Sequence, residues 1–338
     1  AGTATNAADG GVATGNFDAA VTAKGISVIG ANGSAAAFTA DGGAAILTVD
    51  GGAATIGTTG LTVTAGNGGA GDAATLGGNS TATLSSTSAI TGTIRVTGGT
   101  AGSTNNGANA GAAYLTFTDD VVATDQSMVI TGGDGASTNT ANGGAATVEI
   151  IATSTFSSVE LDDGTANDGT KGSATLLFDA AAAETFTGAV TAAVDGEGTI
   201  TIENSNATGL TVANAIGISG TSIGTLNIGT TAEAHAAFTS DVFADAINIS
   251  SATAASSADF NGNVTGDLAI VSDTDDDIAS ATISGNVTGT ITFTDANTGD
   301  DATVTFDGGT TAQTISGAVD GAAASAGGIT TANTAGVT

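Results

Sequence analysis

The sequence predicts an all-β fold, an elongated parallel β-solenoid (β-helix) with loop insertions in its N-terminal half. Three observations predict it: a recurring pair of a large apolar residue and a valine, passages that repeat at nearly constant spacing, and a composition with 53 glycines and no proline. A chain that repeats its apolar positions in this way buries them by stacking each copy on the next.

The recurring pair places a large apolar residue four positions before a valine. Positions i, i+2 and i+4 of a β-strand share a face, so each pair predicts one strand with both residues inside. The pairs are Phe17/Val21, Phe117/Val121, Phe186/Val190, Phe238/Val242, Phe260/Val264, Ile283/Val287 and Ile315/Val319. The internal ladder expected from the later pairs consists of Phe186, Phe238, Phe260, Ile283 and Ile315.

A second, longer repeat occupies the first half of the chain. Leu61, Ile94, Met128 and Val159 begin passages separated by 33, 34 and 31 residues, whereas Phe238 and Phe260 are 22 residues apart. Each long passage is typical of a strand, a long loop of Gly, Asn, Asp and Thr, and a second strand. A loop of about ten residues inserted at one corner of a 22-residue coil gives the longer repeat, and such insertions project from one face.

These repeats predict the domain organisation. Residues 1–15 form an N-terminal segment suited to act as an assembly strand, and residues 16–321 form one continuous solenoid. Within it, long-loop repeats cover residues 61–178 and shorter coils cover residues 185–321, before a small-residue tail at residues 322–338. The absence of proline fits a fold in which most backbone amides join ladders between coils. No apolar run is long enough to cross a membrane, so the chain is not expected to span one.

Charge restricts the partners. Lys24, Arg95 and Lys171 are the only basic residues besides one histidine, against 33 acidic residues, and the net charge is −30. Binding of nucleic acid depends on Lys and Arg, so nucleic acid is excluded as a partner. Stacked coils of this charge repel one another unless cations screen or bridge them. Calcium is the cofactor predicted, because it binds carboxylates and carbonyls in flexible loops.

The candidate calcium ligands are aspartates clustered in predicted turns. The densest group lies in one turn, two further groups follow the same pattern, and Asp119 with Asp120 makes a weaker one. The candidates are Asp273, Asp275, Asp276 and Asp277, then Asp162, Asp163 and Asp168, then Asp295, Asp300 and Asp301. For each group a calcium site and a hydrated acidic turn are the two interpretations.

The sequence offers little for catalysis, and we expect that the protein is not an enzyme. There is no cysteine for thiol chemistry, and no tryptophan to form a carbohydrate platform. The single histidine, His235, has no activated serine near it in the sequence and is expected to be a surface residue. Tyr114 and Met128 align with strand positions and are expected to be structural.

Units such as FNGNVTGDLAIVSDTDDD and TISGNVTGTITFTDANTG, in a Thr/Ala/Gly/Val-rich, cysteine-free and acidic chain, resemble bacterial β-strand-repeat cell-surface proteins. These include S-layer proteins of the α-proteobacterial kind and the passengers of autotransporter-like adhesins. The resemblance covers about residues 16–321 and is compositional and repetitive. It implies an extracellular, calcium-dependent, self-assembling β-solenoid, and it assigns no binding residue.

The function predicted is therefore that of an exported structural protein that self-assembles into an extracellular filament, sheath or surface lattice. Homopolymer contacts are expected through the solenoid ends or termini, and a cell-envelope polysaccharide is a further candidate partner. The alternatives are an adhesin stalk or passenger, and an ice-binding solenoid. The last would align Thr-x-Thr units such as Thr62/Thr64 and Thr116/Thr118 on one flat face.

Overall fold

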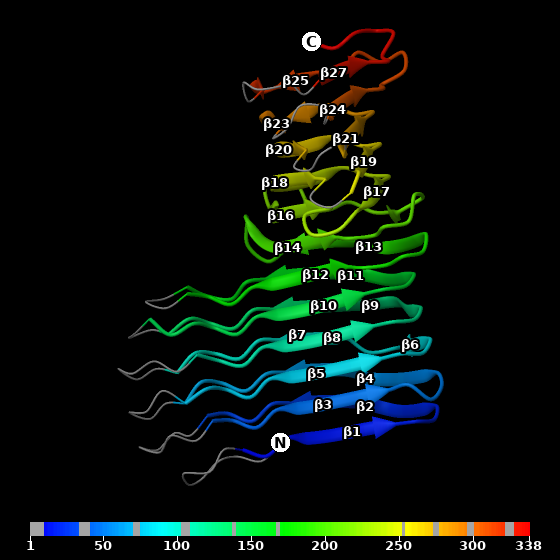
Figure 1. Ribbon diagram of the computed structural model, residues 1–338. Coiled ribbons are helices and arrows are strands. Elements are labelled where there is room, and N and C mark those ends of the chain that lie inside the picture. Colours follow the sequence, from blue (N-terminus) through cyan, green and yellow to red (C-terminus); the bar gives the residue numbers. More distant parts are fainter. Residues whose placement is uncertain are drawn as a thin grey trace. The chain divides into compact units, whose positions relative to one another are not determined.

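A computed structural model describes residues 10–33, 41–69, 75–102, 109–136, 140–166, 170–251, 254–272, 277–295, 301–321 and 328–338. The chain divides into two compact units, unit 1 (Ala1–Leu176) and unit 2 (Leu177–Thr338), which are described separately. In both units the described residues form strands and no helix (Figure 1).

The strands of unit 1 are mostly short segments rich in Thr, Val, Ile and Ala, which favour extended backbone. The last of them crosses the boundary into unit 2. They are β1 (Ala13–Phe17), β2 (Val21–Ile29), β3 (Ala45–Val49), β4 (Ala54–Thr64), β5 (Ser80–Leu84), β6 (Ser88–Ile90), β7 (Ile94–Thr97), β8 (Ala113–Phe117), β9 (Val121–Thr131), β10 (Ala146–Ile150), β11 (Ser154–Asp162) and β12 (Ala174–Phe178).

The strands of unit 2 continue the same alternation of buried and exposed side chains. They are β13 (Glu184–Ala192), β14 (Glu197–Ile202), β15 (Leu210–Val212), β16 (Ile223–Ile228), β17 (His235–Phe238), β18 (Val242–Ser250), β19 (Ser256–Phe260), β20 (Val264–Ser272), β21 (Ile278–Ile283), β22 (Val287–Thr288), β23 (Ile291–Asp295), β24 (Asp301–Phe306), β25 (Ile315–Ser316), β26 (Val319–Gly321) and β27 (Gly328–Thr331). The last strand, β27, lies beyond residue 321, where the sequence analysis ended the solenoid.

Each unit contains two parallel sheets, and each turn of the chain contributes to both. In unit 1 the orders are β1-β3-β5-β8-β10 and β2-β4-β6-β9-β11, with β7 between β4 and β9. In unit 2 they are β14-β16-β18-β20-β22-β25 and β13-β15-β17-β19-β21-β24-β27, with β23 between β20 and β26. Every pairing between these strands is parallel, and inward side chains stack in ladders between the sheets. The predicted all-β parallel solenoid is confirmed.

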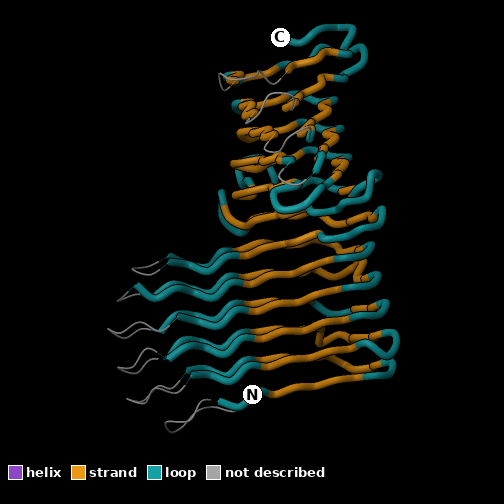
Figure 2. The backbone as a smooth tube through the Cα atoms, in the orientation of Figure 1, coloured by secondary structure: helices purple, strands orange, loops and turns teal. Residues whose placement is uncertain are grey.

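The long-repeat register of unit 1 is confirmed residue by residue. Leu61 pairs with Ile94, Ile94 with Met128, and Met128 with Val159. All four side chains are fully buried. The insertions that lengthen this repeat lie between the second strand of one coil and the first strand of the next, and in unit 1 their described parts extend side by side in one direction (Figure 2).

The pair of large residue and valine is mostly not one strand, which corrects the sequence prediction. In unit 1, β8 ends at Phe117 and β9 begins at Val121, so the residues between them form a corner. Phe17/Val21, Phe238/Val242, Phe260/Val264 and Ile283/Val287 also bridge two strands, and only Phe186/Val190 lies within one, β13. Both ends of a tight corner face the core, so this spacing of inward residues resembles that of a strand.

The predicted internal ladder omits Val212, which pairs with both Phe186 and Phe238, and it is wrong at its last member. Phe238 pairs with Phe260, and Phe260 with Ile283, but the next residue in this ladder is Phe306. Ile315 pairs instead with Val287, in the ladder of the valines. The corner after Phe306 is enlarged, and it is held by the buried Gln313 side chain, which donates to the carbonyls of Ile283 and Gly285 at 2.8 Å.

The loops of unit 1 stack into two walls, one made of the segments that leave the sheets and one made of the segments that return to them. The two walls hydrogen-bond to each other, mostly through glycine. The outgoing and returning segments of successive loops alternate in one chain of backbone N–H···O=C bonds of 2.7–3.0 Å. In this chain the amide of each residue donates to the carbonyl of the next, in the order Gly172, Gly133, Gly144, Gly99, Gly111, Gly66, Gly78, Ala31 and Gly43. A Cβ on Gly133 would overlap the Gly99 carbonyl oxygen, and one on Gly144 would overlap that of Gly111. Glycine is therefore required at these positions because any side chain would prevent the two walls from approaching closely enough to hydrogen-bond.

Candidate functional site

The densest acidic group lies largely outside the described residues. Asp273, Asp275 and Asp276 fall there, as do Asp168 and Asp300. Asp277 is half-buried, and its backbone carbonyl accepts a hydrogen bond from the Ser272 hydroxyl at 2.7 Å. Asp295 ends β23 and Asp301 begins β24, and nothing is described of their side chains.

The described part of the second acidic group engages the protein itself. Asp162 accepts a hydrogen bond from the Gly164 amide, and Asp163 accepts one from the Ala174 amide, both at 2.8 Å. The other Asp163 oxygen is 3.9 Å from the Lys171 ammonium. Across the described ranges, no group of three or more His, Cys, Asp or Glu side chains is placed to hold a metal ion. The calcium sites therefore stay a prediction.

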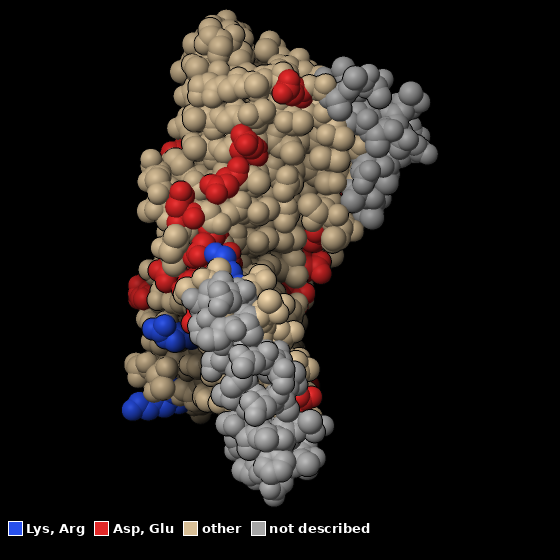
Figure 3. All heavy atoms as spheres, turned by 90° about the vertical axis from the view of Figure 1, so that its left-hand side faces the viewer, with Lys and Arg blue, Asp and Glu red and all other residues tan. Residues whose placement is uncertain are grey.

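The acidic charge is distributed over the surface. Figure 3 shows Asp and Glu side chains spread over the face in view, with Lys and Arg at a few points. All lysines and arginines belong to unit 1, because none follows Lys171 in the sequence. In unit 2, Asp241 accepts from the Asn263 amide at 2.7 Å, and Asn263 accepts from the Asn286 amide at 3.0 Å. Successive coils thus stack polar corners directly above one another.

The Thr-x-Thr units do not share one face. Thr62 lies in β4 and is in register with Arg95, whereas Thr116 lies in β8, in the other sheet of unit 1, beside Glu149. Tyr114 is half-buried on this outer face and donates to Glu149 at 3.0 Å, which agrees with the structural role expected for it.

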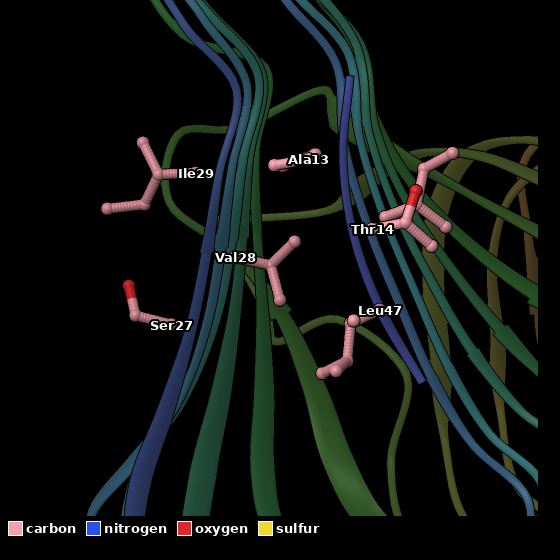
Figure 4. Close-up of a pocket in the computed structure, with 9 residues that line it drawn as sticks. Ala13, Thr14, Ser27, Val28, Ile29 and Leu47 are labelled. Carbon is pink, nitrogen blue, oxygen red and sulfur yellow. The ribbon is translucent and has the colours of Figure 1, made fainter. Parts of the chain in front are cut away.

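The first coil of unit 1 leaves core positions uncovered. Phe17 is 46% exposed, although its register partner Val49 is fully buried. The residues that precede Phe17 in β1 line an open cavity of about 250 Å³, into which Val28 and Leu47 point, while Ile29 points outward (Figure 4). Its lining consists of Ala13, Thr14, Gly15, Ser27, Val28, Ile29, Ala45, Ile46 and Leu47. Among the described strands, β1 pairs only with β3 and β2 only with β4, so each presents an open edge.

The last coil of unit 2 shows the same feature. Val319 is 43% exposed, whereas its register partner Ile291 is fully buried. Ile329 is likewise 43% exposed, opposite the fully buried Val304. Within the described residues, β26 and β27 each pair with another strand on one side only, whereas Ile315 of β25 also donates from its amide to the Thr338 carbonyl at 2.9 Å. The apolar ladders of each unit thus continue to its outermost coil.

His235 is more enclosed than the sequence analysis expected. Its side chain is 19% exposed, and its Nδ1 lies 2.7 Å from the Ser257 hydroxyl. Its Nε2 lies 3.2 Å from a carboxylate oxygen of Glu233. The sequence analysis missed Ser257 because it lies 22 residues beyond His235. That offset is the coil length already seen between Phe238 and Phe260, and it was the signal that would have found this contact.

Comparisons of the chain with protein-family models, with curated proteins and with solved structures each return no match. Among the described residues, no helix is long and apolar enough to cross a membrane.

Proposed function

We propose that the protein is an exported structural subunit that assembles head to tail into an extracellular filament, sheath or surface lattice. The observation that supports this most is the uncovered core at the first coil of unit 1 and at the last coil of unit 2. Phe17 and Ile329 occupy ladder positions whose equivalents one coil inward are fully buried. A coil from a second copy would bury these side chains and pair the open strand edges.

All described strand pairings within one copy are parallel, so a contact between two copies can use the same parallel pairing. The joint between two copies would repeat the pairing that already joins β1 to β3 and β24 to β27. A contact between two different ends of the same chain is heterologous, and it generates an open chain of subunits wherever its rotation does not close a ring. This property distinguishes a filament or lattice component from a closed oligomer.

Calcium is the proposed stabiliser of this assembly, and a cell-envelope polysaccharide is a proposed partner. The net charge of −30 opposes the approach of two copies. No lysine or arginine of unit 2 can neutralise its aspartates, because unit 2 contains none. A divalent cation held by carboxylate oxygens of neighbouring copies or turns would offset this repulsion.

Removal of calcium is expected to disperse the assembly. Sedimentation velocity of the purified chain in millimolar calcium should show large species that return to monomer when a chelator is added. The control is sodium chloride at matched ionic strength, which screens charge without bridging carboxylates. Assemblies that persist in chelator would overturn the role of calcium, and assemblies restored fully by sodium chloride would replace it with simple screening.

An adhesin stalk is the second candidate, favoured by the loops of unit 1. The described parts of these loops extend in one direction beyond the sheets, and loops on a rigid scaffold commonly carry binding residues (Figure 2). In that case the chain would remain monomeric with calcium present, and the loops would contact the partner.

A further inference from the structure

We propose that unit 2 carries an acyl-transfer site in which Ser257 is the nucleophile, His235 the general base and Glu233 the group that orients His235. The proposal is independent of the assembly proposed above. It rests on two contacts, Ser257 Oγ to His235 Nδ1 at 2.7 Å and His235 Nε2 to Glu233 Oε1 at 3.2 Å. A nucleophile within hydrogen-bond reach of a base that a third group orients is the geometry of covalent catalysis.

Glu233 fixes the tautomer of His235, and with it the direction of the hydrogen bond between Ser257 and His235. An ionised carboxylate can only accept, so the neutral imidazole must carry its proton on Nε2 to bond Glu233. Nδ1 is then an acceptor, and the Ser257 hydroxyl must donate to it. The lone pair of the base is therefore directed at the proton that has to leave the nucleophile.

The sheet holds the three residues in place. His235 begins β17 and is in register with Ser257 on β19. The His235 amide donates to the Asn204 carbonyl, and the Ser257 amide donates to the Ala234 carbonyl, both at 2.9 Å. Ser257 is half-buried, so part of this residue is open to a reagent. The next residue in the same register row is Ser280 on β21, which is also half-buried.

The chemistry is transfer of an acyl group from an activated ester. Ser257 Oγ forms a bond to the acyl carbon while its proton moves to His235 Nδ1. The ester C–O bond then breaks, and the departing alcohol takes that proton. Water repeats the sequence on the acyl-serine, with His235 again accepting and returning the proton, so an ester and water give an acid and an alcohol.

The surroundings restrict the substrate class. The amides of β17 and β19 are engaged in the parallel ladders, which leaves few donors for an oxyanion and makes turnover slow. Asp259, two positions beyond Ser257 on the same strand face and in register with Ala237, is exposed and adds negative charge to this face. An uncharged acyl group with a good leaving group, such as an aryl ester or thioester, fits these conditions.

The test is acylation of the full chain by p-nitrophenyl acetate, followed by mass mapping. We expect a burst of one equivalent of p-nitrophenolate and an acetyl group on Ser257 but not on Ser280, which serves as a control within the same molecule. Acylation should fall about 100-fold in His235→Gln. It should fall by a smaller factor in Glu233→Gln and be lost in Ser257→Ala.

Circular dichroism of each variant would show that the sheets persist, and the comparison of Ser257 with Ser280 in the unaltered chain needs no variant. Equal labelling of the two serines, or labelling of neither, would overturn the proposal. So would an acetyl group that stays on His235, or a Ser257 rate that is unchanged in His235→Gln.

Discussion

Replacing Phe260 with Asp is expected to unfold unit 2. The Phe260 ring is 1% exposed and stacks on Phe238 with ring centroids 5.0 Å apart and planes 6° from parallel. Removing a buried phenylalanine costs about 3–5 kcal/mol, and a carboxylate in the same ladder adds the cost of an unpaired buried charge. Thermal unfolding monitored by circular dichroism would measure the loss.

The matched control is Phe17→Asp, which changes the same residue type at the uncovered end of a ladder. Phe17 is 46% exposed, so the new carboxylate remains in water and the loss of stability should be well below that of Phe260→Asp. Equal melting temperatures for Phe260→Asp and the unaltered chain would contradict the internal ladder.

Alanine in the glycine walls of unit 1 is the second change with a large expected effect. At Gly133 a Cβ would overlap the Gly99 carbonyl oxygen, and that backbone is itself fixed by hydrogen bonds to both walls. We expect Gly133→Ala to lower the free energy of unfolding by at least about 1–3 kcal/mol, the usual cost of overpacking. Denaturant unfolding of the single variant would measure it.

Gly15→Ala provides the control within the same unit. A Cβ there would meet only Leu47 Cδ1, at 3.5 Å, which is ordinary van der Waals contact. Because alanine also restricts the unfolded chain, this variant should be neutral or more stable by about 0.4–1 kcal/mol. If both substitutions had the same effect, steric closeness of the walls would not be the reason for the glycines.

How much of the fold the sequence predicts depends on where the coil length stays constant. Leu61, Ile94, Met128 and Val159 are separated by nearly equal steps, so their register followed from counting. The step from Ile283 to Ile315 contains an enlarged corner, and counting by motif therefore missed Phe306. Phe306 lies 23 residues after Ile283, the same step as from Phe260 to Ile283, so counting by coil length instead of by motif would have predicted it.

The candidate sites were less predictable, because they depend on contacts between coils. The glycine walls arise only where outgoing and returning loop segments meet, and no local pattern identifies that contact. Ser257 is a different case, since the 22-residue coil length places it beside His235. Applying the offset of the apolar ladder to polar residues would have predicted this pair.

The most direct test of head-to-tail assembly uses two end variants, each of which introduces a charge at one uncovered coil. Phe17→Asp should block the first coil of unit 1, and Ile329→Asp should block the last coil of unit 2. Sedimentation velocity in calcium should show that each variant alone is monomeric. An equimolar mixture should form dimers and nothing larger, because only one compatible pair of ends remains. Assembly of either variant alone at the level of the unaltered chain, or a mixture that stays monomeric while the unaltered chain polymerises, would contradict stacking through the solenoid ends.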